Sequence, residues 1–152
     1  MRQILPLTLL IVVTTALGAD SSDSEIRHAQ ETFGRCWEAH GKDLTCMDGL
    51  LTQDFNAVTL PGRPLDRAAF IDLVHRLPET NTWKNEKGEY LPSDATVRFY
   101  GNTAVVAYGM VHKIPVEHVD QFTHVYVKTD GHGWQLARLY ASHPNLPTQS
   151  NK

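Results

Sequence analysis

The sequence has 152 residues, of which 41% are hydrophobic and 9% aromatic, and its formal net charge at pH 7 is -3. This length allows one domain with a sizeable hydrophobic core. Because the chain carries no block of basic residues, its composition argues against nucleic acid as a partner.

Residues 1–19 have the composition of a secretory signal peptide. Arg2 provides a positive start, the run from Ile4 to Val13 is almost wholly apolar, and small residues lead up to Ala19. The run is too short for a stable membrane-spanning helix, although a retained N-terminal anchor is the alternative. Cleavage after Gly18 or Ala19 fits the preference for small residues, and we favour Ala19. We therefore predict one domain over residues 20–143, a loosely ordered tail over 144–152, and a secreted or periplasmic protein with no membrane attachment after cleavage.

Apolar residues at helical spacing predict two helices at the start of the mature chain. The first begins at Glu25 and ends at Gly41, a residue typical of helix C-termini. The second, capped by Asp43, covers residues 44–51. The apolar stripe of the first helix consists of Ile26, Ala29, Phe33, Cys36, Trp37 and His40.

Cys36 and Cys46 are the two cysteines of the chain. In an exported protein an even number of cysteines indicates a disulfide, and the short connection between the two helices lets both residues meet. We predict a Cys36–Cys46 disulfide that stabilises the fold by about 2–3 kcal/mol through loop closure.

The middle of the chain predicts a strand, a helix and a loop. A short strand over residues 55–60 ends at Pro61-Gly62, and a third helix over residues 67–77 starts after the N-cap Asp66 and stops at Pro78. The polar stretch 79–91 predicts a flexible loop or an irregular edge strand.

Two long hairpins follow, both rich in β-branched and aromatic residues. The arms 95–100 and 103–113 turn at Gly101-Asn102, and the arms 119–128 and 134–143 turn around Asp130-Gly131. Helices grouped before a mostly antiparallel sheet predict an α+β fold, with a strongly curved sheet wrapped over the helices as a cone.

Alternation along the last hairpin predicts two different faces. One is aromatic with polar groups: Phe122, His124, Tyr126, Trp134, Leu136, Arg138 and Tyr140. The other is small and aliphatic: Val125, Val127, Ala137, Leu139 and Ala141. The first face is typical of a ligand pocket, and the alternative is that His124 and Tyr140 are hydrogen-bonded structural residues at the sheet margin. The second would leave an apolar patch exposed, which predicts a homodimer.

Several stretches resemble the nuclear transport factor 2-like superfamily. They are the first helix with Trp37, the step Gly41-Lys42-Asp43-Leu44, the run from Leu50 to Phe55, and the closing hairpin from Thr123 to Leu136 with Trp134-Gln135-Leu136. Within the superfamily the chain is similar to SnoaL-like domains and to the association domain of the calcium/calmodulin-dependent kinase. The resemblance covers nearly the whole mature chain.

This resemblance implies a cone whose interior holds a small-molecule site and a dimer formed through the outer face of the sheet. The sequence departs from the kinase association domain, which has an Arg at the position of His124 and a His near Tyr140, so anion binding of that kind is in doubt. The carboxylate, Tyr and protonated Asp of steroid isomerases are not recognisable either, because the central strands contain no Asp or Glu except Asp120 at one end.

The residues of the predicted pocket suggest a proton-transfer hypothesis. A neutral His124 with Tyr140 could move a proton at neutral pH, and Arg138 could hold an enolate or carboxylate oxygen. The ligand itself is expected to contact Trp37, Tyr108, Met110, His112, Phe122, Tyr126 and Trp134.

Two weaker alternatives involve other polar residues. Asp54 or Asp66 could act as a base near the mouth of the cone, although such residues more often lie at caps and turns. His112, His118, Asp120 and His124 cluster in sequence but lack a recognised ligand spacing, so no metal and no other cofactor is expected.

Two functional hypotheses from different classes follow. In the first, the protein is an exported binding module for a small, partly apolar molecule, without catalysis. In the second, it is a small lyase, isomerase or cyclase that transfers a proton on a carbonyl-containing substrate. The expected absence of an inward-facing carboxylate favours the first hypothesis.

Overall fold

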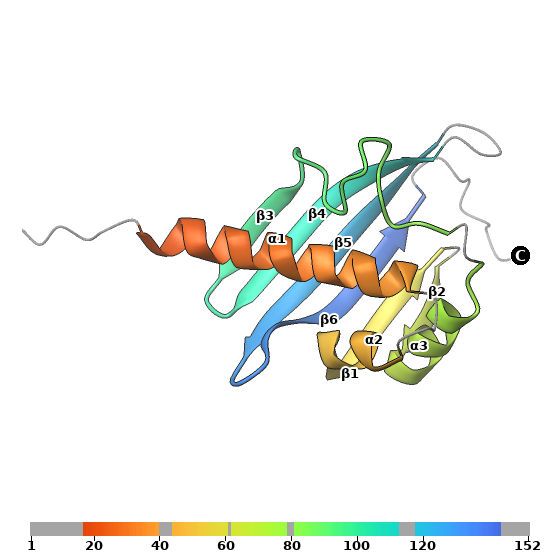
Figure 1. Ribbon diagram of the computed structural model, residues 1–152, viewed down its shortest axis with the longest axis horizontal. Helices are drawn as coiled ribbons and strands as arrows, with labels where there is room; N and C mark the ends of the chain where they lie inside the picture. The colour runs from red at the N-terminus through yellow and green to blue at the C-terminus, as the bar shows by residue number, and fades with distance from the viewer. Residues whose placement is uncertain (1–16, 40–43, 61, 79–80, 113–117, 144–152) are drawn as a thin grey trace, which may run out of the picture.

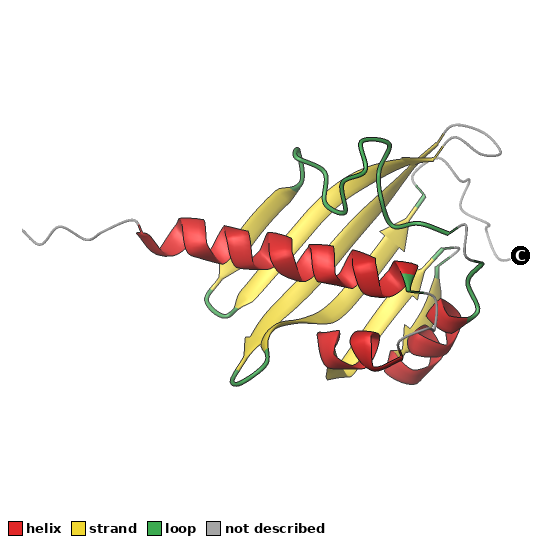
Figure 2. Cartoon of the chain, viewed as in Figure 1, coloured by secondary structure: helices red, strands yellow, loops and turns green. Residues whose placement is uncertain are grey.

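The computed structural model describes residues 17–39, 44–60, 62–78, 81–112 and 118–143. Three helices and six strands occur in these ranges (Figures 1 and 2). In chain order they are α1 (Leu17–Glu38), α2 (Leu44–Leu50), β1 (Leu51–Thr59), β2 (Arg63–Asp66), α3 (Arg67–His75), β3 (Thr96–Tyr100), β4 (Thr103–His112), β5 (His118–Thr129) and β6 (Gly133–Ser142).

The strands form one curved sheet in the order β2-β1-β6-β5-β4-β3, and α1 lies across one face of it (Figure 1). The β1–β6 pairing is parallel and the other pairings are antiparallel. The shorter helices α2 and α3 lie at the end of the sheet formed by β1 and β2 (Figure 2). The predicted α+β fold with a mostly antiparallel, curved sheet is therefore confirmed.

The predicted elements occur, with shifted boundaries in the first half. α1 begins at Leu17 rather than Glu25, and β1 begins directly after α2 rather than at Phe55. The short edge strand β2 was not expected, because Pro64 cannot donate a ladder hydrogen bond and its neighbours suggested only the approach to a helix. Asp66 caps α3 as predicted, since its Oδ1 accepts a hydrogen bond from the Ala69 amide at 2.8 Å.

The predicted alternation along β6 is wrong beyond Leu136. The pairing of β5 with β6 passes from Tyr126–Leu136 to Val125–Arg138, so Ala137 is an extra residue in a β-bulge. Leu136 and Leu139 therefore both point to the inner face, whereas Arg138 and Tyr140 point outward and Tyr140 is 43% exposed. One inserted residue reverses the assignment of every later side chain on this strand.

The core lies between α1 and the inner face of the sheet, and a disulfide joins the end of α1 to α2. It links Cys36 to Cys46, as predicted. Trp37, next to Cys36, packs against Phe70 of α3 and against Trp83. Among the helices that the structure describes, none is both long and apolar enough to cross a membrane.

The boundaries predicted for the signal peptide and the tail fall mostly on residues 1–16 and 144–152, which lie outside the described residues. The predicted helix end at Gly41 and the cap Asp43 also lie outside them. These assignments therefore stay predictions.

Candidate functional site

A cavity of about 610 Å³ opens at the end of the sheet where α3 and β2 face the inner side of β4, β5 and β6. Its walls are mainly aromatic and aliphatic: Trp37, Leu65, Phe70, Leu73, Trp83, Met110, Phe122 and Leu139. We call this space the mouth cavity. Its volume lies within the range of about 300–1,000 Å³ that is usual for small-molecule sites.

One carboxylate on the cavity wall is almost completely buried. Asp120 on β5 is 5% exposed and lines the mouth cavity. Its Oδ1 lies 2.7 Å from Nδ1 of His143, which directly follows β6. The expectation that no carboxylate faces inward is therefore wrong: Asp120 shares the inward parity of Phe122 and His124 on β5.

The loop between α3 and β3 supplies another part of the wall. Trp83 is 5% exposed, and its ring lies 5.0 Å from Phe122 and 4.6 Å from Trp37, between ring centroids. The loop is attached to the end of α1, because Trp37 Nε1 donates to Asn81 Oδ1 at 2.9 Å and the Thr82 hydroxyl donates to Glu38. A side chain on an irregular segment thus becomes a fixed wall of the cavity.

Behind Trp83 and Phe122 lies a group of buried polar side chains, which we call the inner cluster: Gln30, Tyr108, His124 and Tyr126. Gln30 Oε1 accepts from the Tyr126 hydroxyl at 2.6 Å and lies 2.8 Å from His124 Nδ1. Gln30 Nε2 and Trp83 Nε1 both donate to the Tyr108 oxygen, at 3.0 and 3.1 Å. Four strongly buried polar groups therefore satisfy one another.

These contacts fix the protons of the inner cluster. Because the Gln30 Oε1 can only accept, His124 carries its proton on Nδ1 and leaves Nε2 as the acceptor. The Tyr108 oxygen already accepts two hydrogen bonds, so its hydroxyl donates to His124 Nε2, 3.4 Å away. Both ring nitrogens of a neutral His124 are engaged.

Burial sets the ionisation of the same residues. Removal from water lowers the pKa of His124 to about 3, and it raises the pKa of Tyr108 and of Tyr126 above the ordinary value. All three side chains are thus neutral across the physiological range. Neither His124 nor the two tyrosines line the mouth cavity.

The structure does not bring the predicted catalytic residues together. His124 lies in the inner cluster, whereas Arg138 and Tyr140 lie on the opposite face of the sheet because of the bulge at Ala137. Arg138 Nη2 lies 3.0 Å from Asp54 Oδ2, in an exposed ion pair.

The predicted ligand-contacting residues divide into three groups. Trp37, Met110 and Phe122 line the mouth cavity, and Tyr108 and Tyr126 belong to the inner cluster. Trp134 lies elsewhere, with its Nε1 donating to Glu25 Oε2 at 2.9 Å. The side chain of His112 lies outside the described residues, and so does that of His118.

The alternative sites find little support in the described residues. Asp66 is engaged as a helix cap, and Asp54 is exposed on the outer side of the sheet. Within the described ranges, no group of three or more His, Cys, Asp or Glu side chains converges as a metal site would require.

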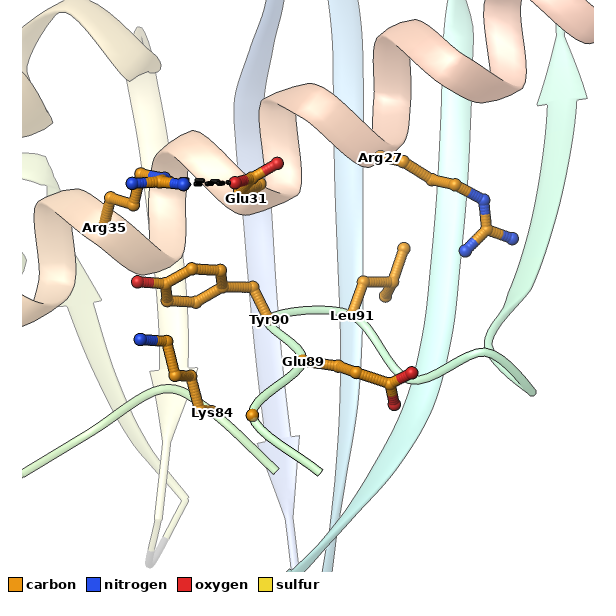
Figure 3. Close-up of a pocket in the computed structure, with 8 residues that line it drawn as sticks. Arg27, Glu31, Arg35, Lys84, Glu89, Tyr90 and Leu91 are labelled. Carbon is orange, nitrogen blue, oxygen red and sulfur yellow. Dashed lines mark hydrogen bonds and ion pairs between the residues drawn. The ribbon is translucent and has the colours of Figure 1, made fainter. Parts of the chain in front are cut away.

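A second hollow, of about 430 Å³, lies between the outer side of α1 and residues 84–91. Figure 3 shows the Tyr90 ring placed between Arg35 and Lys84. The two cations on either side of this ring are already paired: Arg35 with Glu31 at 2.6 Å, and Lys84 with Glu38 at 3.5 Å. We interpret this hollow as part of the attachment of the loop to α1.

Two residues that matter here were missed from the sequence. Gln30 follows Ile26 by four residues and precedes Phe33 by three, so it lies in the apolar stripe of α1, and a polar residue in such a stripe is a signal for a buried partner. Trp83 gave no such signal, because a loop has no periodicity.

Comparison with known proteins rests on structure alone. No protein-family model matches the chain, and a search of curated proteins also found no match. Among solved structures, a nuclear transport factor 2-like protein with a cystatin-like fold from Novosphingobium aromaticivorans matches with a TM-score of 0.61 at 15% identity, over 90% of this chain and 94% of its own. The chain has the nuclear transport factor 2-like fold.

Two further structures show how varied proteins with this fold are. A candidate dehydratase of the nuclear transport factor 2-like family from Streptomyces avermitilis matches with a TM-score of 0.60 at 20% identity, over 82% of this chain and 96% of its own. A nuclear transport factor 2-like protein of unknown function in nutrient uptake from Rhodospirillum rubrum matches with a TM-score of 0.56 at 22% identity, over 78% and 97%. At these identities the nuclear transport factor 2-like fold is shared, whereas function has to be argued from the site.

Proposed function

We propose that the protein is a small-molecule-binding domain whose ligand occupies the mouth cavity. The observation that carries this proposal is the cavity itself: about 610 Å³ of space with aromatic walls and a few polar groups. Protein interiors are close-packed, so an open space of this size between aromatic walls supports a binding role. The inner cluster closes the deep side, so a ligand enters no further than Trp83 and Phe122.

α3 offers a matched pair of variants to test ligand binding. Ala69 lines the cavity, whereas its neighbour Ala68 is exposed and does not. We expect the neutral dye Nile red to become fluorescent with the wild-type protein and with Ala68→Phe, and to lose most of that signal with Ala69→Phe. Equal dye binding by all three proteins would contradict the proposal, and native mass spectrometry of protein from its own host would look for the natural ligand.

A second candidate function is proton transfer, which the buried Asp120–His143 pair favours. A carboxylate on an apolar cavity wall can take a proton from the carbon next to a carbonyl group, leaving an enolate, and can return it at another position. His143, 2.7 Å from Asp120, would orient the carboxylate. In this mechanism the residues that act differ from the trio expected from the sequence.

Deuterium exchange into a simple ketone such as cyclohexanone tests this second candidate. We expect the wild-type protein to accelerate exchange next to the carbonyl group, and Asp120→Asn to reduce that acceleration by about 100-fold or more. Asp72→Asn is the control, because Asp72 is another carboxylate of the cavity but is exposed. If Asp120→Asn exchanges deuterium as fast as wild type, binding without catalysis remains the function.

Export and dimerisation belong to the same proposal. The disulfide and the signal-like residues 1–19 support secretion or transfer to a periplasm, which N-terminal sequencing of the secreted protein tests. Exposed Tyr140 and half-buried Val125 and Val127, which share the outer face of the sheet, support a homodimer through that face. Light scattering at micromolar concentration tests the dimer, and Tyr140→Glu is expected to yield monomers.

A further inference from the structure

The charged side chains around the mouth cavity do not all have partners. Asp72 is paired with Arg76 at 2.5 Å, and Asp120 with His143 at 2.7 Å. Arg63 also lines the cavity, yet its guanidinium makes no hydrogen bond or ion pair with any residue that the structure describes. The rim therefore carries one positive charge that is not balanced by any carboxylate of the described residues.

Arg63 is well placed to receive the charged end of a ligand. It begins the edge strand β2, opposite Thr59 of β1, and it is exposed to solvent. Leu60 and the buried Leu65 lie beside it on the cavity wall. An anionic group could thus stay hydrated at Arg63 while an apolar body enters the cavity next to these leucines.

The other end of the cavity carries a buried carboxylate instead of an exposed cation. β5, with Asp120, is separated from β2 by β6 and β1 in the sheet. Three steps between neighbouring strands correspond to roughly 14 Å along the sheet. Asp120 is a buried carboxylate, so a second negative charge placed there would be repelled and also removed from water.

We infer that the mouth cavity takes an amphipathic monocarboxylate, with its carboxylate at Arg63 and its apolar body between Trp83, Phe70 and Phe122. This inference rests on the proposed binding function and specifies the class of ligand. A bidentate guanidinium–carboxylate contact would supply orientation, and the aromatic walls would supply most of the affinity.

A set of eight-carbon probes with different end groups tests the inference on the full mature protein. The probes are octanoate, 1-octanol, octylamine and octanedioate, and binding is followed by tryptophan fluorescence, since Trp37 and Trp83 both line the cavity. We expect octanoate to bind about five- to tenfold more tightly than 1-octanol, and octylamine and octanedioate to bind more weakly than octanoate.

Arg63→Gln is expected to remove the preference for octanoate while leaving the affinity for 1-octanol unchanged. Arg98→Gln is the matched control, because Arg98 is an exposed arginine on β3 that does not line the cavity, and it should behave as wild type. Equal binding of octanoate and 1-octanol, or an octanoate preference that survives Arg63→Gln, overturns the inference and leaves the binding function standing. Binding of none of the probes overturns both.

Discussion

The two ends of the space under α1 are built from similar side chains but differ in what their polar groups do. In the inner cluster, Gln30, Tyr108, His124 and Tyr126 satisfy one another, and none of them lines the mouth cavity. In the mouth cavity, Asp120 and Arg63 lie on the wall of an open space. Mutual saturation makes a polar group structural, whereas the Arg63 guanidinium, which lies beside free volume, is available to a ligand.

The largest expected effect is on the inner cluster. Gln30→Leu keeps a similar volume but leaves Tyr108, His124 and Tyr126 without their shared partner, so we expect the free energy of unfolding to fall by about 3 kcal/mol or more. Asn81→Leu at the mouth removes the acceptor of Trp37 Nε1, where water can substitute, and should cost about 1 kcal/mol. Urea denaturation measures both unfolding free energies. Equal losses for the two variants would contradict the proposed difference between the inner cluster and the mouth cavity.

A second prediction concerns pH. The pKa of His124 is about 3 in the folded protein, below its ordinary value of 6.5. At a pH between these two values, His124 is neutral in the folded protein and takes up a proton when the protein unfolds. The free energy of unfolding should therefore be unaffected by His124 above pH 6.5 and should fall by up to about 1.4 kcal/mol for each pH unit below it.

The measurement is urea denaturation of wild type and His124→Gln at a series of pH values between 7 and about 4. The part of the pH dependence of the unfolding free energy that is present in wild type and absent in His124→Gln is due to His124. His132→Gln, at an exposed turn, is the control and should keep the wild-type slope. A His124→Gln profile parallel to that of wild type would show that His124 already has water or charge around it.

Removing the disulfide tests whether the mouth depends on its anchors. The double variant Cys36→Ser, Cys46→Ser opens a short loop at the end of α1, and we expect a loss of about 2–3 kcal/mol. Because Trp37 and Glu38 next to it hold Asn81 and Thr82, Nile red binding should weaken as well. Retained dye binding with full stability would show that the loop holds the wall without the disulfide.

A smaller effect is expected where the loop lies on α1. A Cβ added to Gly34 would lie 2.2 Å from the Tyr90 ring, so Gly34→Ala must displace that ring and should cost about 1–2 kcal/mol. In a Tyr90→Ala background the same substitution should stabilise α1 slightly, because alanine is the better helix former. Equal effects in both backgrounds would contradict the contact.

Local sequence signals predicted the fold well and the site only in part. The stripe from Ile26 to Trp37, the cap Asp66, the two cysteines and the hairpin turns each depend on near neighbours, and each occurs as expected. The mouth cavity depends on contacts between distant segments, such as Trp83 with Phe122.

The error on β6 has a specific cause. Strict alternation placed Arg138 and Tyr140 inside, and the extra residue Ala137 moved both outside. Nothing in the local sequence marks that insertion, because alanine fits either face. Asp120 was assigned only to a strand end, yet alternation from Phe122 and His124 already placed it inward.

The bulge at Ala137 also bears on how proteins of this shape diverge. Deleting one codon at this position would turn the rest of β6 over, carrying Arg138 and Tyr140 to the inner face and Leu139 and Ala141 to the surface. A single insertion or deletion event could thus replace an apolar lining by a charged and phenolic one without any amino-acid substitution. Between relatives of this chain, strand register as well as residue identity can determine the chemistry of the interior.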